Sequence, residues 1–375
     1  MKNIISGTRT NVPPFRYDIV GSFLRPDSLK EARAAYDRGE CNAAGLQETE
    51  DVEIRRLIDI QKALGLKAVS DGEYRRSWWH LDFFLGIEGT VKVNLNINPG
   101  RPDPKTRAES FQIVDRISLG NHPMIEHFVR LKELAGHDVL AKMTIPSPAL
   151  FHFVQSHQVN EVYGDDQELY KDIVKVYREM IAGLYAAGCR YLQLDDTSWG
   201  TLCSGRHRAL LRGRGQDPDQ LAADYVKLIN ESIAGKPSDM TIALHVCRGN
   251  YVSTWFAAGG YEPVAETLFA QCRVDAFFLE YDSERSGGFE PLRHIKDQRV
   301  VLGLVTTKHG GLESKEVLKA RIAEASEYVD LNQLCLSPQC GFASTEEGNL
   351  ITEEEQWDKI RLVIDTANEI WTEPE

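Results

Sequence analysis

The stretch TIALHVCRGN (241–250) places two metal-capable side chains two residues apart. Its first residues are mostly apolar and typical of a strand, on which His245 and Cys247 would project from the same face. A metal site would use both side chains as ligands. A histidine and a thiol packed side by side in the core would give the same local pattern, so this stretch alone leaves both interpretations open.

The elements that would position these residues are strands that alternate with amphipathic helices. We predict eight strands, at 17–23, 67–73, 139–146, 191–196, 241–247, 275–282, 299–307 and 331–340. This alternation predicts an α/β fold, a (β/α)8 TIM barrel, in preference to an open doubly wound sheet. An open sheet with a nucleotide site would need a Gly-rich phosphate loop, and GSFLRP after the first strand does not match one.

The chain is predicted to form a single catalytic domain over residues 1–375. The segment 83–138 is long and contains a Pro- and Gly-rich stretch, so we interpret it as an insertion after the second strand that forms a lid.

Several predicted strands end in ionisable groups, and the carboxyl ends of barrel strands converge on one mouth. Four of these groups are His245, Cys247, Glu280 and Cys340. Imidazole, thiolate and carboxylate are the ligands that zinc binds in proteins, and thiolates favour zinc over magnesium or calcium. Glu280 lies in the apolar run AFFLEYD, where a charge without a partner would be costly. The four residues are therefore a candidate zinc site.

A set of ordered motifs extends this interpretation to nearly the whole chain. They are VGSFLRP, SDGE, YLQLDD, LHVCRGN, FLEYD, GLVTTK and SPQCGF, of which LHVCRGN and SPQCGF are the most specific. With these motifs the chain resembles the cobalamin-independent methionine synthases, in particular their catalytic C-terminal barrel. The resemblance implies zinc held by His245, Cys247, Glu280 and Cys340. It also implies that Ser22 binds the carboxylate of homocysteine and that Glu73 and Asp195 bind its ammonium group.

The implied activity is zinc-dependent transfer of a methyl group to the thiol of homocysteine, or of a closely similar thiol, to give methionine. We expect 5-methyltetrahydrofolate as the methyl donor. The longer members of the family carry a second barrel that helps to bind folate, whereas this chain resembles the shorter, single-barrel relatives. A methylcorrinoid or another non-folate donor, or a different small thiol acceptor, is therefore an alternative. A non-catalytic protein that binds zinc or an amino acid is another.

Two further groups of residues are candidates for roles at the mouth. Lys308 and His309 in TTKHGG lie where the longer enzymes have a histidine associated with proton transfer, so either could protonate the departing group. A solvated pair in a loop is the alternative. Trp78, Trp79 and Trp199 follow predicted strand ends and could stack on a flat donor, although packing beneath loops would also account for them.

The composition limits the partners of the protein. The net charge of −13 argues against binding to nucleic acids or anionic membranes, and no apolar run approaches the roughly 20 residues of a membrane span. The N-terminal residues lack the apolar core of a secretion signal, and seven scattered cysteines do not indicate a disulfide framework. We expect a cytoplasmic protein whose partners are a homocysteine-like thiol and a small methyl donor.

Overall fold

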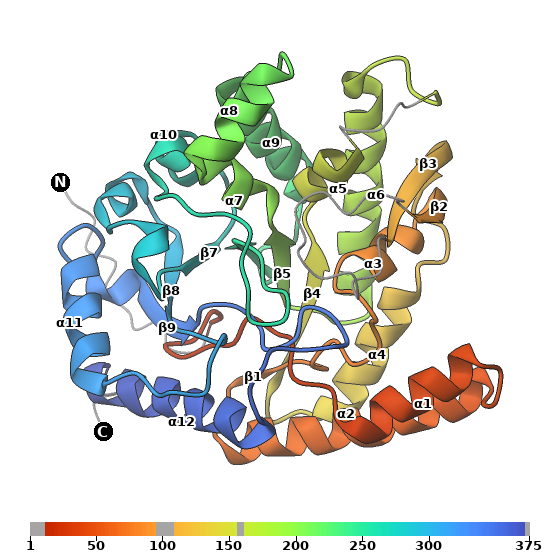
Figure 1. The fold of residues 1–375 in the computed structure, drawn as a ribbon, viewed down its shortest axis with the longest axis horizontal. Helices are drawn as coiled ribbons and strands as arrows, with labels where there is room; N and C mark the ends of the chain where they lie inside the picture. The colour runs from red at the N-terminus through yellow and green to blue at the C-terminus, as the bar shows by residue number, and fades with distance from the viewer. Residues whose placement is uncertain (1–11, 95–108, 156–160, 372–375) are drawn as a thin grey trace.

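Seven parallel strands curve around a common centre, with helices outside them (Figure 1). The computed structural model describes residues 12–94, 109–155 and 161–371. The hydrogen-bonded order is β1-β4-β5-β6-β7-β8-β9. The strands are β1 Ala68–Val69, β4 Leu140–Pro146, β5 Tyr191–Asp196, β6 Thr241–Val246, β7 Ala276–Glu280, β8 Arg299–Val305 and β9 Leu334–Pro338. Each coincides with or falls inside a predicted strand, and the first and last in this order are left with one open edge each.

The segment that contains the first predicted strand closes the ring between these two edges. Tyr17 forms a parallel bridge with Leu336 of β9, and Ser22 forms one with Gly72 just after β1. The Phe23 N–H also donates to the Gly72 carbonyl, with 3.2 Å between nitrogen and oxygen. The predicted (β/α)8 TIM barrel is therefore confirmed, although the strand predicted at 17–23 is reduced to isolated bridges.

Side chains take the place of a regular strand ladder along this closing segment. The Lys142 ammonium group donates to the Ile19 carbonyl, and the Gln193 amide donates to the Val20 carbonyl at 2.7 Å. The Ser70 hydroxyl donates to the Gly21 carbonyl. These polar side chains lie inside the barrel and bind the carbonyls of the segment, so it is held without continuous backbone pairing. The apolar pattern of 17–23 could not indicate this arrangement.

A buried ion pair lies at the centre of the barrel beside this segment. Lys142 and Asp18 are almost fully buried, and the distance from Lys142 Nζ to Asp18 Oδ1 is 3.2 Å. The Tyr191 hydroxyl donates to the other Asp18 oxygen at 2.8 Å, and Lys142 Nζ lies 4.1 Å from the ring centre of Phe278. Burial lowers the pKa of Lys142, and the neighbouring carboxylate of Asp18 opposes that shift.

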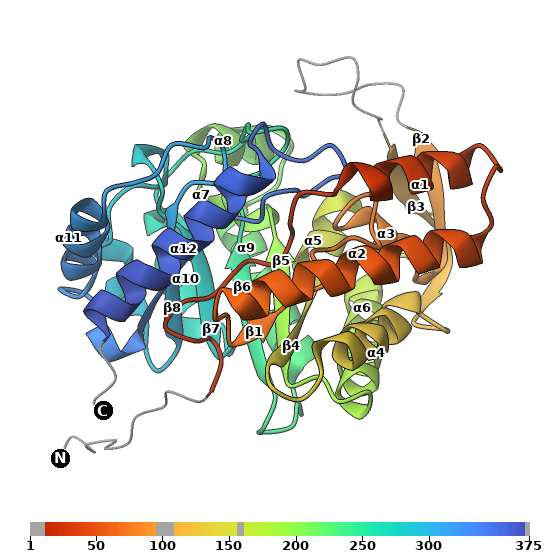
Figure 2. The ribbon, with the colours of Figure 1, turned by 90° about the horizontal axis from the view of Figure 1, so that it is seen from below.

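The helices pack their apolar faces against the outside of the strands, and Figure 2 shows α2 and α12 crossing the barrel. The α-helices of the described chain are α1 Asp27–Asp37, α2 Ala43–Ala63, α3 Leu81–Leu85, α4 Pro123–Ala135, α5 Pro148–Gln155, α6 Asp166–Ala186, α7 Ser198–Cys203, α8 Gly205–Gly213, α9 Pro218–Ile233, α10 Glu262–Gln271, α11 Lys315–Ala325 and α12 Glu353–Ile370. Short 3-10 turns occupy Glu284–Ser286, Glu290–His294 and Leu331–Gln333. The ends follow local chemistry: Asp217 caps α9 ahead of Pro218, and Thr352 forms a capping box with Glu355. None of the described helices combines the length and apolarity that crossing a bilayer requires.

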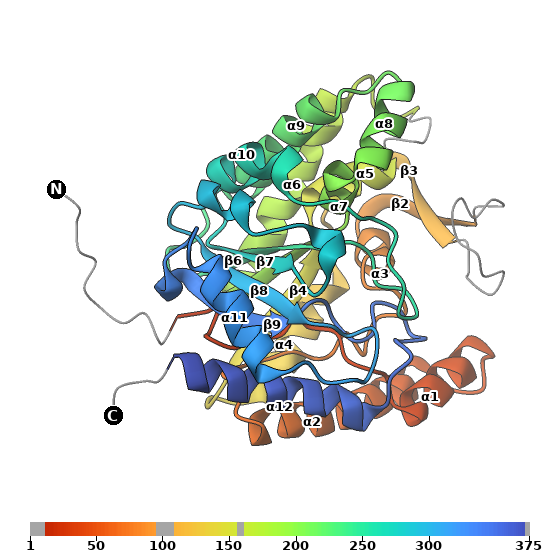
Figure 3. The same cartoon turned by 60° about the vertical axis from the view of Figure 1, so that its left-hand side comes forward.

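The segment 83–138 contains two different kinds of structure. β2 Glu88–Asn94 and β3 Glu109–Ser118 form an antiparallel hairpin, separate from the barrel sheet, that projects at one side of the molecule (Figure 3). Residues 95–108, which connect these strands, lie outside the described residues. The helix α4 packs against β4 and α2, as an outer helix of the barrel does. The lid role of this segment stays a prediction.

The buried ion pair generates a prediction about stability. Replacing Lys142 by Met leaves the Asp18 carboxylate buried without its cation, so we expect the free energy of unfolding to fall by about 3–5 kcal/mol. Urea denaturation followed by circular dichroism measures this loss. Lys62→Met is the matched control because Lys62 pairs with Asp138 at 2.9 Å on the surface, where a loss of about 1 kcal/mol or less is expected. Equal losses in the two variants would contradict the central role of Lys142.

Candidate functional site

The four predicted metal ligands meet at one end of the barrel. One ligand atom from each of His245, Cys247, Glu280 and Cys340 lies within 4.8 Å of the other three, and all four side chains are buried. His245 lies near the end of β6 and Cys247 follows directly after that strand; Glu280 is the last residue of β7, and Cys340 follows β9. Residues distant in the sequence are therefore brought together by the parallel order of the strands, as the convergence of strand ends predicted.

The protonation of the sulfur pair depends on its neighbours. Cys247 Sγ and Cys340 Sγ are 3.7 Å apart, and the Gly249 N–H donates to Cys247 Sγ at 3.3 Å. The hydrogen bond from Cys247, together with nearby His245, holds the pKa of the Cys340 thiol well below its usual range. The same hydrogen bond, with burial, raises the pKa of Cys247 well above its usual range. Of the two thiols, Cys340 is therefore the more acidic.

His245 contributes a buried imidazole to the cluster. Both nitrogens are buried, and neither makes a hydrogen bond of ordinary geometry with a described residue. Burial lowers the pKa of His245, but Cys340, Asp195 and Glu280 outweigh it and raise the pKa to about 9. Buried polar atoms normally have partners, so the deprotonated form of this imidazole is suited to bind a metal ion at the cluster.

Glu280 is fully buried and held by donors on both oxygens. The Arg248 N–H donates to Oε1 at 2.9 Å, and Arg285 Nη2 lies 2.9 Å from Oε2. Arg285 also pairs with Asp282 at 2.7 Å. One nitrogen, two sulfur and one carboxylate donor, oriented in this way within one buried cluster, fit the ligand set that zinc takes in proteins.

A second buried cluster, of acids, lies beside the sulfurs. Glu73 follows β1 and adopts a φ of 61°, next to Gly72 at 66°. The Thr144 hydroxyl donates to Glu73 Oε1 at 2.9 Å, and Arg76 Nη1 lies 3.4 Å from the same oxygen. The other oxygen, Oε2, is buried and has no hydrogen-bond partner among the described residues. Burial raises the pKa of Glu73, with Arg76 and Arg25 opposing.

Asp195 is the penultimate residue of β5 and interacts electrostatically with both Glu73 and His245. Gln193 Nε2 donates to Asp195 Oδ1 at 2.6 Å. Burial raises the pKa of Asp195 to about 7, with His245 lowering it and Glu73 raising it further. A carboxylate pair of this kind is electrostatically suited to a cationic group, because a shared positive charge would relieve both acids.

Ser22 lies against the turn that carries Cys340. The Phe342 N–H donates to the Ser22 carbonyl at 2.9 Å, and the Ala343 N–H donates to Ser22 Oγ at 3.4 Å. A Cβ on Gly341 would lie 1.9 Å from Ser22 Oγ, so this close approach requires glycine. The structure thus brings Ser22 to the same mouth as the predicted metal ligands, while its role in substrate binding stays a prediction.

The two candidate proton donors lie in different environments. Lys308 is buried, and its Nζ donates to Asn250 Oδ1 at 3.2 Å. Its charge is one of the factors that lower the pKa of Cys340, after Cys247 and His245. His309 is exposed. The geometry therefore brings Lys308, and not His309, into the electrostatic surroundings of the cluster.

The three predicted donor-stacking tryptophans differ in how much of each ring is open. Trp199 is fully buried on α7, and Trp78 is buried beside a bridge between its backbone and Thr345. Trp79 is half-buried, and its ring packs against His80 at 4.9 Å between ring centres. Trp78 and Trp199 are therefore packing residues in this conformation. Their rings would have to become exposed before either could stack on a donor.

Sequence reasoning missed the residues that connect the mouth loops. Asn250 Nδ2 donates to the Gly341 carbonyl at 2.7 Å, and Asn349 Nδ2 donates to Asn250 Oδ1 at 3.0 Å. Asn250 could have been found from the sequence, because it is the last residue of the motif LHVCRGN, a signal for a functional role. Arg285 and Asn349 had none, because their contacts come from loops whose paths the strand pattern does not determine.

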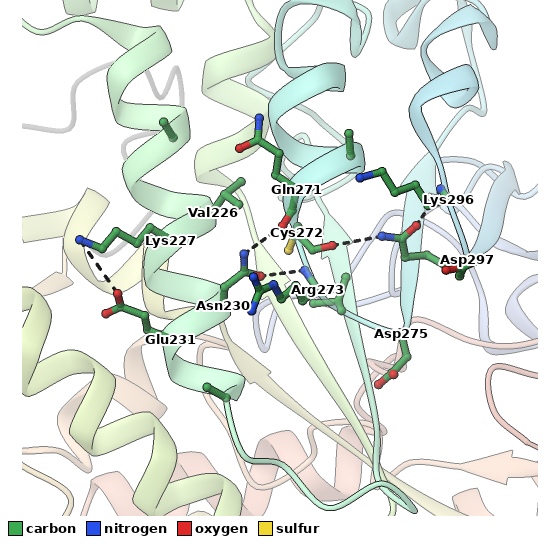
Figure 4. Close-up of a pocket in the computed structure, with 15 residues that line it drawn as sticks. Val226, Lys227, Asn230, Glu231, Gln271, Cys272, Arg273, Asp275, Lys296 and Asp297 are labelled. Atoms are coloured by element: carbon green, nitrogen blue, oxygen red, sulfur yellow. Dashed lines mark hydrogen bonds and ion pairs between the residues drawn. The ribbon is translucent and has the colours of Figure 1, made fainter.

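A groove of about 930 Å³ lies at the opposite end of the barrel (Figure 4). It is bordered by α9, α10 and Asp275, which precedes β7, whereas Glu280 ends that strand. Lys227 and Glu231 pair at 4.0 Å along its edge, and Asn230 donates to the Gln271 carbonyl at 2.9 Å. Active sites of (β/α)8 barrels lie at the carboxyl ends of the strands, so this groove does not belong to the candidate site.

Comparison with known proteins identifies the family. The family model described as "Cobalamin-independent synthase, Catalytic domain" matches residues 153–368. The chain is 47% identical over 360 residues to the uncharacterized protein YxjH of Bacillus subtilis (strain 168), covering 96% of this chain and 95% of that protein. The chain belongs to the cobalamin-independent methionine synthase family. Its general activity is accordingly that of a methionine synthase-like methyltransferase.

Solved structures show the same fold in this family. A Listeria monocytogenes protein, described as a candidate vitamin-B12 independent methionine synthase, matches with 41% identity and a TM-score of 0.76. The match covers 96% of this chain and 99% of that chain. A B12-independent methionine synthase from Shewanella sp. W3-18-1, solved in complex with selenomethionine, matches with 17% identity and a TM-score of 0.71, covering 94% and 96% of the two chains.

The ligand cluster generates a prediction about metal content. Replacing Cys340 by Ser should remove most of the bound zinc, because a hydroxyl is a poor substitute for a thiolate ligand. Zinc content per chain, measured by elemental analysis after dialysis, tests this. Cys335→Ser is the matched control, since Cys335 is a fully buried thiol on β9 outside the cluster and should leave the metal in place. Retention of near-stoichiometric zinc by the Cys340 variant would remove Cys340 from the ligand set.

Proposed function

We propose that the protein transfers a methyl group to the thiol of homocysteine, giving methionine, with zinc held by His245, Cys247, Glu280 and Cys340. The observation that carries this proposal is the unpaired, buried oxygen of Glu73 next to Asp195, beside the sulfur cluster. An amino-acid thiol needs a site for its ammonium group within reach of the site for its sulfur. The two adjoining clusters supply both, which a sulfonated thiol without an ammonium group would not use.

Different residues at the mouth would bind different parts of homocysteine. Glu73 and Asp195 bind the ammonium group of homocysteine, and Ser22 with its neighbouring backbone binds the carboxylate. Zinc, when bound, lowers the pKa of the substrate thiol and fixes its sulfur. Barrel walls that bury the cluster exclude water from it. The Shewanella relative was solved in complex with selenomethionine, which supports an amino-acid product of this size.

The methyl group would come from 5-methyltetrahydrofolate. In the transfer the sulfur forms a bond to the methyl carbon as the bond from that carbon to the donor nitrogen breaks. The departing nitrogen then takes a proton. Lys308 is the candidate for this step because it is buried near Cys340 and hydrogen-bonded to Asn250. We place this chemistry in the cytoplasm.

A direct assay tests the proposed activity. Zinc-loaded protein, homocysteine and methyl-labelled 5-methyltetrahydrofolate, as mono- and triglutamate, should give labelled methionine, which chromatography measures. Methylcobalamin serves as the competing donor. Methionine formed from methylcobalamin alone would replace the folate donor, and no product with either donor would refute homocysteine methylation.

The acid pair generates a separate prediction about substrate affinity. Asp195→Asn should weaken homocysteine binding by about 1–3 kcal/mol, because a charged hydrogen bond to the ammonium group is lost, while zinc stays bound. Isothermal titration measures the affinity. Asp196→Asn is the matched control, since Ser147 and Ser198 already satisfy the Asp196 carboxylate and homocysteine affinity should not change. An unchanged affinity in the Asp195 variant would place the ammonium group elsewhere.

A further inference from the structure

Two neighbouring aromatic residues are exposed on the loop that follows β6. Trp255 is 51% exposed and Phe256 is 49% exposed. Tyr36, on α1, is the other aromatic residue of comparable exposure in the described chain. Large exposed rings are costly to hydrate, so a pair of them at the mouth of a catalytic barrel calls for a function.

Both rings lie one contact away from a candidate metal ligand. Phe256 packs on Gly249, where an added Cβ would lie 2.3 Å from Phe256 Cδ1, and the Gly249 N–H donates to Cys247 Sγ. The Trp255 ring centre is 5.1 Å from Arg285 Cζ, and Arg285 in turn binds Glu280. The aromatic pair is therefore separated from the buried cluster by Gly249 and Arg285 alone.

A strained turn fixes the pair in this position. Val252 has a φ of 43° and Ser253 has a φ of 64°, between Tyr251 and Thr254, which hydrogen-bond to each other as the ends of a turn. Positive φ at both central residues is typical of a type I′ turn, which normally uses Asn or Gly and rarely a β-branched residue such as Val.

External contacts hold this turn. The Ser253 N–H donates to Asn349 Oδ1 at 3.0 Å, and the Leu350 N–H donates to Ser253 Oγ at 2.9 Å. Asn349 is the residue that also binds Asn250 beside the cluster. Strain that is maintained by the surroundings is concentrated at functional positions, and here it sets where Trp255 and Phe256 project.

We propose that Trp255 and Phe256 form the platform on which the flat heteroaromatic ring of the methyl donor stacks. The inference rests on the proposed methyl transfer and identifies the residues that select its donor. Arg285 covers one side of the Trp255 ring, and His207 meets Phe256 at 5.8 Å between ring centres, which leaves the exposed ring surfaces for a planar ligand. Trp78 and Trp199, in contrast, are buried.

Steady-state kinetics with 5-methyltetrahydrofolate as the varied substrate test the platform. Trp255→Ala should raise the donor KM about 10-fold, as expected for the loss of one stacking partner, and Trp255→Phe should recover most of that loss. The homocysteine KM and the zinc content should stay at wild-type values. Trp371→Ala is the matched control: Trp371 is partly exposed beneath Arg16, at 5.5 Å, away from the mouth, and its loss should leave the donor KM unchanged.

Binding without turnover separates this inference from the proposed function. Equilibrium dialysis of unmethylated tetrahydrofolate against zinc-loaded protein should show binding that falls about 10-fold in Trp255→Ala and further in the double variant with Phe256→Ala. Dialysis that shows this dependence while the methyl-transfer assay fails would support the platform and refute the activity. Wild-type-like binding in the double variant, or no binding by the wild type, would overturn the platform, whatever the assay shows.

Discussion

The Lys142 ammonium group lies inside the barrel, where it is one of the side-chain groups that attach the closing segment. It contacts the Asp18 carboxylate and the Ile19 carbonyl, and the ring of Phe278 lies beside it. Without this cation the carboxylate would be buried with hydrogen-bond donors but no opposite charge, at a cost that exceeds the contribution of most single contacts. The segment it holds continues directly to Ser22, so the geometry of the mouth depends on an interaction in the interior of the barrel.

The electrostatics of the mouth follow from how charges are buried there. With zinc bound as proposed, two thiolates and a carboxylate would carry more negative charge than one divalent ion neutralises, so the cluster would need further positive charge. Arg285 supplies it beside Glu280, and the Arg248 guanidinium is fully buried over the ring of Tyr261, 4.4 Å from its centre. Burial opposes the charge of Arg248, but Tyr261, Cys203 and Glu280 raise its pKa, so it stays a cation. These buried cations stabilise negative charge on the cluster and would favour an anionic ligand set in the proposed zinc site.

Sequence reasoning predicted the parts of the structure that depend on strand order. The fold class and the meeting of His245, Cys247, Glu280 and Cys340 follow from parallel strands whose ends share one edge, and the structure has both. The irregular pairing of the segment 17–23 could not be predicted from the sequence, because the side chains that bind its carbonyls come from Lys142, Gln193 and Ser70, far along the chain.

Loop residues could not be placed from the sequence. Trp199 and Trp255 both follow strands, yet one is fully buried and the other half exposed, since burial depends on which helix covers each loop. Arg285 is similar: its partners Glu280 and Asp282 are close in sequence, but only the path of the 3-10 turn after β7 brings the three together. Local pattern does not contain this information.

The closing segment also constrains the order in which the chain can fold. Tyr17 pairs with Leu336, so the ring cannot be completed until nearly the whole chain has left the ribosome. The partners of Asp18, however, are Lys142 and Tyr191, which both lie N-terminal to β6. The N-terminal segment can therefore be held early on a half-barrel, with its other edge open for β9. Such a long-range final contact makes closure slow and leaves that edge open to unwanted pairing until it occurs.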